Sequence, residues 1–235
     1  MRISVILPTY NEFEGVTDIV PRIEAVVKQT ELDLEIIVVD DGSKDGTLEA
    51  IQDLSSKYGN IVAIGRPCKM GFGSAIKKGI EVSTGDLICT MEADGSQYPE
   101  YLPKMLCKMF DGCGLVLGSR FAPGSSIANV PLKKYIMSRI YNLFFCYIYG
   151  TGVHDNTTGF QLYTKEFAKR AHVMNIENND FSFLLEIVLK AKRMKMRIAE
   201  TPTTYVYRKR GSKFGMKAFL SYVGLLLNVI THKSD

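Results

Sequence analysis

Carboxylates follow two of the β-branched runs in this sequence. One run ends in Asp40 and Asp41, and a later run ends in Glu92 and Asp94. Oxygen ligands spaced like the second pair suit a Mg²⁺ or Mn²⁺ ion that also holds a diphosphate, and acids like the first pair can hydrogen-bond a nucleoside base or ribose. For Asp41 and Asp45 a simpler role is to cap the next helix, whereas Asp40 and Asp94 are interpreted as functional.

The elements that would position these acids alternate along the first half of the chain. Runs rich in β-branched residues alternate with helical patterns, which predicts a mostly parallel central sheet with helices on both faces. Ligands bind such a sheet at the carboxyl ends of its strands, so we expect the acids to meet at one edge. The expected strands are 3–7, 35–40, 61–65, 87–92 and 115–118, and the expected helices are 13–28, 46–57, 73–83 and 99–109.

Asn11 marks the expected start of the first helix. It is followed three residues later by Glu14, a spacing typical of a helix N-cap. The segment 8–11 is therefore predicted to be a loop at the carboxyl end of the first strand, on the same edge as the acids.

The alternation stops after Gly118. Loops are expected over 122–131 and 150–159, and no internal repeat or linker is present. We therefore predict a single domain over 1–235. Further helices are expected over 133–149, 165–172, 181–194 and 218–230.

The composition indicates a folded globular protein. Of the 235 residues, 46% are hydrophobic and 23% are charged, which argues against a disordered or collagen-like chain. Lys and Arg number 29 against 25 Asp and Glu, and the net charge of +4 is too small to indicate a nucleic-acid partner. The five cysteines are widely spaced and include no CxxC pair, which argues against a disulfide framework or a zinc site and favours a reducing cytosol.

Two further sequence patterns allow both a functional and a structural interpretation. Gly71 and Gly73 open a helix whose N–H groups approach a phosphate in one interpretation, and whose start packs closely on the sheet in the other. The turn has neither a P-loop lysine nor Rossmann spacing, so it supports neither an NTPase nor a dinucleotide enzyme.

The histidines show no metal-ligand spacing, and a structural or solvated role is expected for each. They are His154, His172 and His232.

Short motifs run in order through almost the whole chain. They are PTYNE at 8–12, DDGS at 40–43, GFG at 71–73, TGD at 84–86, EAD at 92–94, PE at 99–100, GSRF at 118–121, DNTTGF at 155–160 and RKRGSK at 208–213. This ordered set resembles the inverting family 2 glycosyltransferases, and most of all the dolichol-phosphate (polyprenyl-phosphate) mannose synthases. The resemblance implies a GT-A type nucleotide-diphospho-sugar transferase fold, with 1–120 as the nucleotide-sugar-binding half and 121–235 as the acceptor-side half.

The resemblance also implies the ligands of the donor. Asp94 would be the principal metal ligand, with Glu92 and Ser96 beside it around Mg²⁺ or Mn²⁺. The nucleotide-sugar pocket would be formed by Pro8, Tyr10, Glu12, Asp40, Asp41, Glu92 and Ala93.

Cationic residues are implied for the phosphates, because guanidinium groups bind phosphate in a bidentate manner. Arg120 and Arg208 would be catalytic together with Asp94. The acceptor phosphate would be contacted by Arg120, Arg208 and Lys213.

The sequence departs from the family pattern at three places. Glu92 stands where the metal motif usually begins with Asp, and Gln161 stands where relatives usually have Arg, so one positive charge is lost. One residue is missing between Gly211 and Ser212 in the basic loop. The first two departures are the only hints of an alternative class, a non-catalytic sugar-nucleotide-binding or scaffold protein.

The implied activity is transfer of a hexose, mannose from GDP-mannose, to dolichyl or another polyprenyl phosphate with inversion at the anomeric carbon. Such an acceptor needs no strong general base, because the second pKa of a phosphate monoester is about 6. UDP-glucose is the alternative donor. A hydroxyl is the alternative acceptor, and it would need a base such as Asp180 or Glu186. A nucleotidyltransferase is not supported, because no glycine-rich loop with a basic residue follows the first strand.

A lipid acceptor requires a membrane surface. The expected helix 133–149 is basic at one end and rich in aliphatic and aromatic residues beyond it, which is typical of an interfacial helix; an ordinary core helix is the alternative. The apolar run 218–230 would reach only about 20 Å, too short for a bilayer core roughly 30 Å thick. We expect a cytoplasmic protein, peripheral on the cytosolic face of a membrane, held there by the surface or by a small membrane-anchoring subunit.

Overall fold

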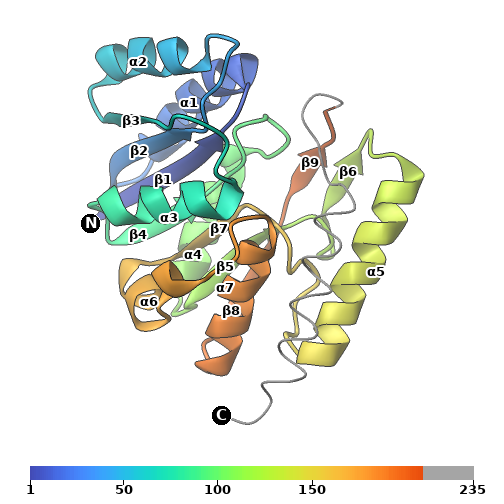
Figure 1. Ribbon diagram of the computed structural model, residues 1–235. Helices are drawn as coiled ribbons and strands as arrows, with labels where there is room; N and C mark the ends of the chain where they lie inside the picture. The colour runs from blue at the N-terminus through green and yellow to red at the C-terminus, as the bar shows by residue number, and fades with distance from the viewer. Residues whose placement is uncertain (209–235) are drawn as a thin grey trace.

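The computed structural model describes residues 1–208, so Lys213 and the expected helix 218–230 lie outside the described residues. A seven-stranded sheet has the order β3-β2-β1-β4-β7-β5-β8 (Figure 1). Its neighbouring strands are parallel except at β7, which runs antiparallel to β4 and to β5. A second sheet pairs β6 with β9. The strands are β1 (Arg2–Thr9), β2 (Asp33–Asp40), β3 (Ile61–Gly65), β4 (Leu87–Thr90), β5 (Leu115–Ser119), β6 (Ser126–Ala128), β7 (Gln161–Thr164), β8 (Ile198–Pro202) and β9 (Thr204–Val206).

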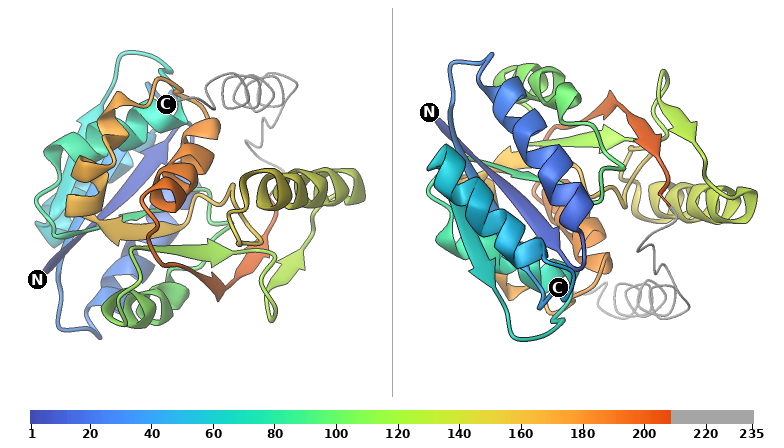
Figure 2. Two further views of the ribbon diagram at one scale, coloured as in Figure 1. Left: turned by 90° about the horizontal axis from the view of Figure 1, so that it is seen from below. Right: turned by 90° about the horizontal axis from the view of Figure 1, so that it is seen from above.

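Two layers of helices cover the main sheet. Helices α1, α2 and α4 share one core with Val5 of β1, and α3, α6 and α7 share the other core with Ile6. Neighbouring residues of a strand point to opposite faces, which is why β1 is apolar on both sides. The left panel of Figure 2 shows helices on both sides of the sheet. The helices of these layers are α1 (Phe13–Val27), α2 (Thr47–Tyr58), α3 (Phe72–Val82), α4 (Leu102–Phe110), α6 (Lys165–Arg170) and α7 (Ser182–Arg193), with short 3₁₀ turns η1 (Pro99–Tyr101) and η2 (Val173–Asn175).

The first half of the chain folds largely as its sequence predicts, but Pro8 and Thr9, which were expected in a loop, belong to β1 and pair with Val39 and Asp40 of β2. Its expected strands and helices are all present, and the fourth helix begins as the 3₁₀ turn η1. The mostly parallel sheet with helices on both faces is confirmed. Strands β6 to β9 were not expected, because each has only three to five residues and none has a clear alternating pattern. One of them, β6, lies inside the expected loop 122–131.

The start of α1 differs from the prediction. Glu12, not Asn11, occupies the N-cap position, and Asn11 has a left-handed backbone with a φ of 57°. The side-chain oxygen of Asn11 accepts a hydrogen bond from the N–H of Lys44 at 2.9 Å. The N–H of Phe13 donates to the carboxylate of Asp45 at 3.2 Å. A side chain of the loop before α2 therefore has the capping role that was expected for Asn11.

Helix α5 (Leu132–Tyr149) lies at the side of the molecule near β6 and β9 (Figure 1), and it confirms the expected helix 133–149. Only Asn142 and Phe145 of this helix are buried. Phe145 packs with Leu185 and Leu189 of α7. The alternative of an ordinary core helix is wrong, because α5 exposes many large apolar side chains. These are Leu132, Tyr135, Ile136, Met137, Ile140, Leu143, Phe144, Tyr147 and Ile148.

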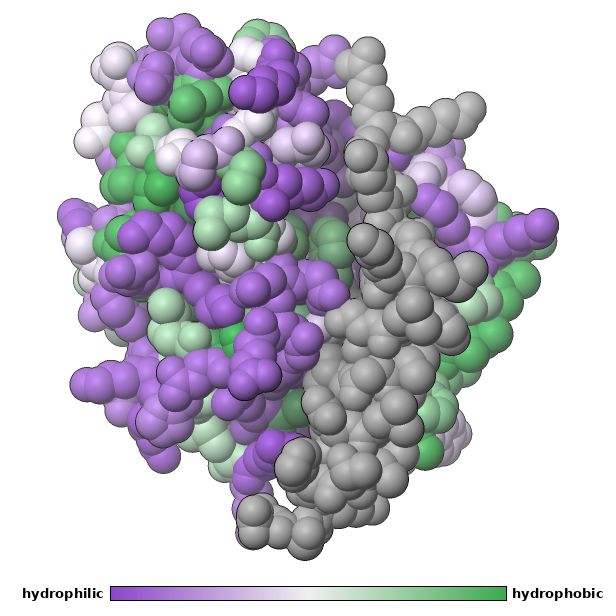
Figure 3. Space-filling model, viewed as in Figure 1, coloured by the Kyte–Doolittle hydropathy of each residue, from purple (hydrophilic) through white to green (hydrophobic). Residues whose placement is uncertain are grey.

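We call these exposed side chains the apolar band of α5. Most of them recur every three or four positions, so they share one broad face of the helix. Figure 3 shows hydrophobic residues along the edge of the molecule where Figure 1 shows α5. Within residues 1–208, no helix has both the length and the apolar character needed to cross a membrane.

Candidate active site

Three carboxylates meet at the carboxyl edge of the sheet. Glu12 precedes α1, and Glu92 and Asp94 lie in the loop after β4. Burial, and then the negative charge of Asp94, raise the pKa of Glu12 to about 7 and that of Glu92 to about 8. Such shifts arise where like charges share a poorly solvated site. We call these three acids the acid cluster; their shared negative charge is one that a bound cation would offset.

A glycine brings the two parts of the acid cluster together. Gly15 lies in the first turn of α1, against the backbone of Ala93. A Cβ on Gly15 would stand 2.1 Å from the carbonyl oxygen of Ala93, closer than any side chain can approach. The absence of a side chain at this position thus lets α1 carry Glu12 up to the loop of Asp94.

The side chain of Glu92, which is one methylene longer than the aspartate of the resembled motif, is accommodated by its neighbours. Its Oε1 accepts a hydrogen bond from Nε2 of Gln97 at 3.1 Å, and its backbone N–H donates to Oε1 of Gln97 at 3.1 Å. The same Oε1 lies 2.8 Å from the point that a Cβ on Gly159 would occupy. Gly159 therefore makes room for a glutamate where the resembled motif begins with aspartate.

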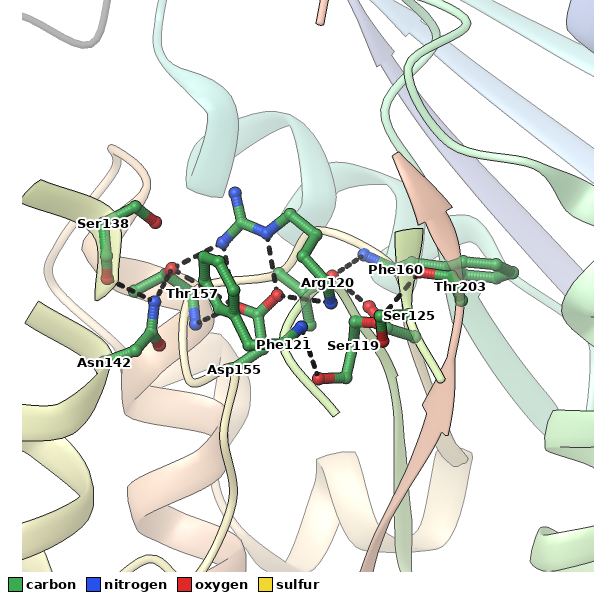
Figure 4. Close-up of polar contacts among 12 residues, drawn as sticks. Ser119, Arg120, Phe121, Ser125, Ser138, Asn142, Asp155, Thr157, Phe160 and Thr203 are labelled. Atoms are coloured by element: carbon green, nitrogen blue, oxygen red, sulfur yellow. Dashed lines mark hydrogen bonds and ion pairs between the residues drawn. The ribbon is translucent and has the colours of Figure 1, made fainter. Parts of the chain in front are cut away.

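Arg120 follows β5 and is held by a buried carboxylate (Figure 4). Its Nε and Nη2 donate to the two oxygens of Asp155 at 2.7 and 2.8 Å, which forms a bidentate ion pair. Burial alone would lower the pKa of Arg120, but the charge of Asp155 raises it. The positive charge of Arg120 lowers the pKa of Glu92, which places the arginine in the same site as the acid cluster.

Thr157 completes the surroundings of this guanidinium. Its Oγ1 accepts a hydrogen bond from Nη2 of Arg120 at 2.9 Å. Nη1 makes no hydrogen bond within residues 1–208, and Figure 4 shows a guanidinium nitrogen without a partner that points away from Asp155. This nitrogen is available to an anion. Arg120 lies at the edge where its place after the fifth expected strand puts it, whereas no sequence motif indicated Asp155 and Thr157 as its partners.

Arg208 lies over the loop that carries Asp94. Its guanidinium covers Gly95, where a Cβ would stand 2.6 Å from it, and the φ of Gly95 is +71°. One of its nitrogens lies 3.9 Å from the carboxylate of Asp18, and its charge lowers the pKa of Glu12. A cation expected from the sequence is therefore found beside the expected acids.

Tyr205 of β9 borders the acid cluster as well. Its phenol lies beside the hydroxyl of Ser96, and burial and the charge of Glu92 raise its pKa. Ser96 is buried, and its N–H donates to Asp94 at 2.8 Å. The guanidinium of Arg120 lies 5.5 Å from the centroid of the Tyr205 ring. Tyr205 thus connects the acids with Arg120, a role that no sequence motif indicated.

Asp40 ends β2 at the same edge of the sheet. Its buried carboxylate accepts hydrogen bonds from the hydroxyl of Thr9 at 3.1 Å and from the N–H of Ser43 at 2.9 Å. The hydroxyl of Ser43 also donates to it. Asp40 therefore orders the loop after β2, and its contact with a base or ribose stays a prediction.

Asp41 and Asp45 differ in what they bind. Asp45 accepts hydrogen bonds from the N–H and hydroxyl of Thr47 at 3.2 and 2.5 Å, so it supports the start of α2 as expected. Asp41 instead forms a buried ion pair with Arg66. It also accepts hydrogen bonds from two backbone N–H groups of the loop 66–71, both at 3.1 Å. The capping interpretation of Asp41 is wrong, because this loop folds back onto its carboxylate.

The remaining residues expected to bind the nucleotide lie nearby along the edge. Lys69 places its Nζ 4.3 Å from the centroid of the Tyr10 ring. Pro8 lies in β1 opposite Val39 of β2, and Ala93 is buried in the loop after β4. Their contacts with a nucleotide stay predictions. No sequence motif indicated Arg66 or Lys69.

The glycine turn before α3 serves close packing. The N–H of Gly73 donates to the carbonyl oxygen of Asn179 at 2.9 Å, and the N–H of Gly71 donates to Asp41. A Cβ on Gly71 would stand 2.3 Å from the oxygen of Asn179, and one on Gly73 would stand 2.7 Å from Cβ of Phe183. The turn is closely packed, as one alternative expected, but its partners are Asn179 just before α7 and Phe183 in the first turn of α7, and not the sheet.

Gln161, where the resembled motif usually has Arg, is buried in β7. Its Nε2 donates to the carbonyl oxygens of Thr158 at 3.1 Å and Leu184 at 3.2 Å. The amide ties β7 to α7 and supplies no positive charge to the site.

The bases considered for a hydroxyl acceptor lie at the start of α7. Asp180 accepts hydrogen bonds from the N–H and hydroxyl of Ser182 at 2.8 and 2.6 Å. Burial raises the pKa of Glu186, and the charges that act on it are those of Lys190, Asp180 and Glu177. These contacts do not join either acid to the acid cluster.

His154 has the structural role that was expected for it. Its Nδ1 lies 2.7 Å from Oε2 of Glu200 in β8. The backbone N–H groups of His154 and Asp155 donate to the same carboxylate at 2.9 and 3.0 Å. Glu200 thereby holds the turn that carries the partner of Arg120.

The donor chemistry of the acid cluster fits a hard divalent cation. Asp94 and Glu92 offer carboxylate oxygens and Ser96 offers a hydroxyl, which are the ligands that Mg²⁺ and Mn²⁺ prefer. Residues 1–208 contain no preformed group of three His, Cys, Asp or Glu side chains that could hold a metal ion by itself.

Comparison with known proteins establishes the family. Residues 4–171 match the sequence model of glycosyl transferase family 2. The chain belongs to this family. It is similar to the polyprenol monophosphomannose synthase of Mycolicibacterium smegmatis, with 31% identity over 89% of this chain and 79% of that protein. It is also similar to a dolichol-phosphate mannosyltransferase of Pyrococcus furiosus, with 33% identity over 95% of this chain, and it spans 62% of that relative's length.

Solved structures show the fold of this family 2 glycosyltransferase. Glucosyl-3-phosphoglycerate synthase from Mycobacterium tuberculosis, in complex with Mn²⁺ and UDP-glucose, matches 97% of this chain and 77% of its own chain with a TM-score of 0.68 and 16% identity. Mannosyl-3-phosphoglycerate synthase from Rubrobacter xylanophilus matches 99% of this chain and 74% of its own with a TM-score of 0.60 and 19% identity. The likeness confirms the expected GT-A fold. The family assignment favours an enzyme over the non-catalytic alternative.

Proposed function

We propose that this protein transfers mannose from GDP-mannose to dolichyl phosphate or another polyprenyl phosphate, with inversion at the anomeric carbon. The observation that carries the proposal is the similarity, over 89% and 95% of the chain, to two proteins named as synthases or transferases of polyprenol- or dolichol-phosphate mannose. The site supports it, because carboxylates suited to a cation lie beside arginines suited to phosphates.

The proposed metal site lies within the acid cluster. Asp94 and Glu92, with Ser96 beside them, would hold Mg²⁺ or Mn²⁺. When bound, such an ion offsets the negative charge of the donor's diphosphate. Glu12 and Arg208 lie beside these ligands, where Glu12 adds a carboxylate to the site and Arg208 adds a positive charge.

The proposed nucleotide pocket lies along the edge from β1 to β2. Asp40 and Asp41 would bind the base or ribose, and Pro8, Tyr10 and Ala93 would line the pocket. The loop 66–71 would border this pocket, since Arg66 pairs with Asp41 and Nζ of Lys69 lies 4.3 Å from the centroid of the Tyr10 ring.

The proposed reaction requires no proton transfer by the protein. An oxygen of the lipid phosphate attacks the anomeric carbon on the face opposite to the diphosphate. The new C–O bond forms while the bond to the leaving group breaks, and GDP departs with the electron pair. The acceptor is largely ionised at neutral pH, because its second pKa is about 6.

Arginines would stabilise the phosphate charges of both substrates. Asp155 keeps Arg120 charged and oriented, and Nη1 of Arg120 is left for the acceptor phosphate. Arg208 lies beside the acid cluster, where the leaving diphosphate would lie. Preorganised donors of this kind contribute roughly 100-fold to 1,000-fold in rate each. Lys213 is proposed as a third phosphate contact.

We propose that the apolar band of α5 lies on a lipid bilayer. The band faces solvent, and Lys133 in the first turn of α5 is exposed. Arg139 adds positive charge near the site, because its guanidinium lies 5.0 Å from the ring of Phe121, the residue after Arg120. Positive charge next to an apolar helical face matches an anionic lipid surface.

We also propose that the protein is peripheral on the cytosolic face of the membrane. All five cysteines are free thiols, and Cys68 and Cys107 are exposed, which suits a reducing compartment. Besides the apolar band of α5, a small membrane-anchoring subunit would hold the protein at the membrane.

The decisive experiment measures the transfer of label to lipid. The protein is incubated with labelled GDP-mannose, UDP-glucose or UDP-N-acetylglucosamine, together with Mn²⁺ and a polyprenyl phosphate, and the products are extracted into organic solvent. Label from GDP-mannose in the organic phase supports the proposal. Label from UDP-glucose alone would change the donor, and label that stays aqueous with every donor would refute the lipid acceptor.

Binding to vesicles tests the role of α5. Ile140→Asp and Leu143→Asp should weaken co-sedimentation with vesicles of phosphatidylcholine and phosphatidylglycerol, because each places a charge in the apolar band. Met174→Asp is the matched control, since Met174 is an exposed apolar residue of η2 outside the band. Vesicle binding that survives the α5 substitutions would contradict the proposal. If these substitutions change the oligomeric state and leave vesicle binding intact, the apolar band contacts a second copy of the chain.

A further inference from the structure

A buried amide lies on the side of α5 that faces the protein. Asn142 is 1% exposed, whereas its sequence neighbours Ile140 and Leu143 are 53% and 47% exposed. Asparagine is a poor helix former, and burying an amide costs free energy unless its hydrogen bonds are made. A specific set of contacts must therefore account for an asparagine at this position.

Those contacts join α5 to the turn 153–157 (Figure 4). Oδ1 of Asn142 accepts a hydrogen bond from the N–H of Asn156 at 2.6 Å. Its Nδ2 donates to the carbonyl oxygen of Ser138 at 2.9 Å and to Oγ1 of Thr157 at 3.3 Å. An apolar side chain of similar size would leave the N–H of Asn156 without this partner.

Thr157 links Asn142 to Arg120 through hydrogen bonds. Its Oγ1 accepts hydrogen bonds from Nη2 of Arg120 at 2.9 Å and from Asn142, and it donates to Oδ1 of Asp155 at 3.4 Å. A hydroxyl has one donor and two acceptor positions, so all of them are used here. One hydroxyl therefore connects the helix, the guanidinium and the buried carboxylate.

The turn that carries Asp155 is held from two sides. Glu200 of β8 accepts the N–H groups of His154 and Asp155, and Asn142 of α5 accepts the N–H of Asn156. The bidentate pair fixes Arg120 relative to Asp155. These two attachments fix Asp155 relative to the sheet and to α5.

We infer that Asn142 and Thr157 are positioning residues, through which α5 sets the direction in which Arg120 presents Nη1 to the acceptor phosphate. The inference rests on the proposed transfer to a polyprenyl phosphate. Because the same helix carries the apolar band, one element sets both the contact with the bilayer and the direction of the arginine. Bonds between guanidinium and phosphate depend on direction, and a misplacement of about 1 Å can cost about 100-fold in rate.

The test compares substitutions at Thr157 with a matched control in the same loop. Thr157→Val removes the hydroxyl and keeps the shape, whereas Thr157→Ser keeps the hydroxyl. Thr151→Val is the control, because Thr151 is also buried and its hydroxyl has no partner within residues 1–208. Asn142→Leu removes the connection from the side of the helix.

The readouts are kcat and KM for each substrate in vesicles, and the binding of dolichyl phosphate in detergent without a donor. We expect Thr157→Val to lower kcat/KM for the acceptor by about 10-fold to 100-fold and to weaken acceptor binding, with KM for GDP-mannose within about twofold of the parent. Thr157→Ser and Thr151→Val should stay close to the parent. Asn142→Leu should behave like Thr157→Val.

A structural role alone would lower the melting temperature and leave kcat/KM unchanged at temperatures where the protein is folded. Parent-like acceptor kinetics and binding in folded Thr157→Val would overturn the inference, even if Asn142→Leu fails to fold. If the parent binds the acceptor but transfers no label, the proposed function is wrong, and the binding measurement still decides the role of Thr157.

Discussion

The α-carbon of Gly15 lies so near the carbonyl oxygen of Ala93 that a methyl group there would stand 2.1 Å from that oxygen. The oxygen belongs to the backbone, so it cannot move aside as the end of a flexible side chain can. The contact sets the spacing between α1 and the loop after β4, and therefore between Glu12 and Asp94.

We expect Gly15→Ala to push α1 away from this loop. Overpacking of this kind lowers the free energy of unfolding by about 1–3 kcal/mol, and the displacement of Glu12 from Asp94 should lower transfer as well. Urea unfolding and label transfer measure the two effects. The control is Gly112→Ala, in a turn where a Cβ meets no atom within 4 Å but φ is +87°. The control should lose stability through its backbone and keep its transfer rate, and equal activity in both variants would contradict the prediction.

Asp94→Asn should separate activity from stability. The charge of Asp94 raises the pKa of Glu12 and of Glu92, so its removal relieves repulsion within the acid cluster. We expect an equal or higher melting temperature and a loss of transfer of at least about 100-fold. Chelation of divalent ions should abolish transfer in the parent, and added Mn²⁺ should restore it. Asp53→Asn, an exposed acid on α2, serves as the control. Near-parent turnover of Asp94→Asn would refute the metal assignment.

Asp155→Asn should destabilise the protein more than a similar change on the surface. Asp155 is fully buried in its bidentate pair with Arg120, which is 20% exposed. Loss of the negative charge leaves the guanidinium without its counter-charge, at a cost of up to about 3 kcal/mol in unfolding free energy. Glu100→Gln is the comparison, because Glu100 forms a bidentate pair with Arg22 on the surface. That change should cost less than about 1 kcal/mol, and equal costs in urea unfolding would contradict the argument.

Glu35 should make part of the stability depend on pH. Burial would raise its pKa, but hydrogen bonds from Ser4 and Thr84 outweigh burial and lower it below the ordinary value of 4.5. The ionised carboxylate therefore stabilises the fold above a pH of 4.5, and this contribution is lost as the pH falls through the lowered pKa. The difference in unfolding free energy between the parent and Glu35→Gln should be largest near neutral pH and shrink in acid. Glu31→Gln, at an exposed position, should show a small difference throughout, and a constant difference for Glu35→Gln would refute the assignment.

The sequence predicts the arrangement of the acids well, because parallel strands end at a common edge. Glu92 and Asp94 follow β4 and Arg120 follows β5, two strands that run in the same direction on either side of β7, so these residues lie at the same edge. Long amphipathic helices and doubly buried strands also carry their own periodic signals. These signals are local, which is why the first half of the chain could be predicted.

The sequence does not reveal which distant side chains pair. Asp155 and Arg120 are 35 positions apart, and nothing in the spacing of either one points to the other. Asp41 has the type and place of a helix cap, and only the path of the loop 66–71 turns it into the partner of Arg66. The four-residue strand β7 is too short to show a period of two.

The position of β7 has a consequence for synthesis. This strand, Gln161–Thr164, lies between β4 and β5, which both precede it in the chain. While the polypeptide emerges from the ribosome, β4 and β5 each present a row of unsatisfied backbone groups until β7 arrives, and such edges attract other chains. A nascent chain that stops before Thr164 thus has an open gap in its sheet, and it is the species that chaperones and proteases would act on.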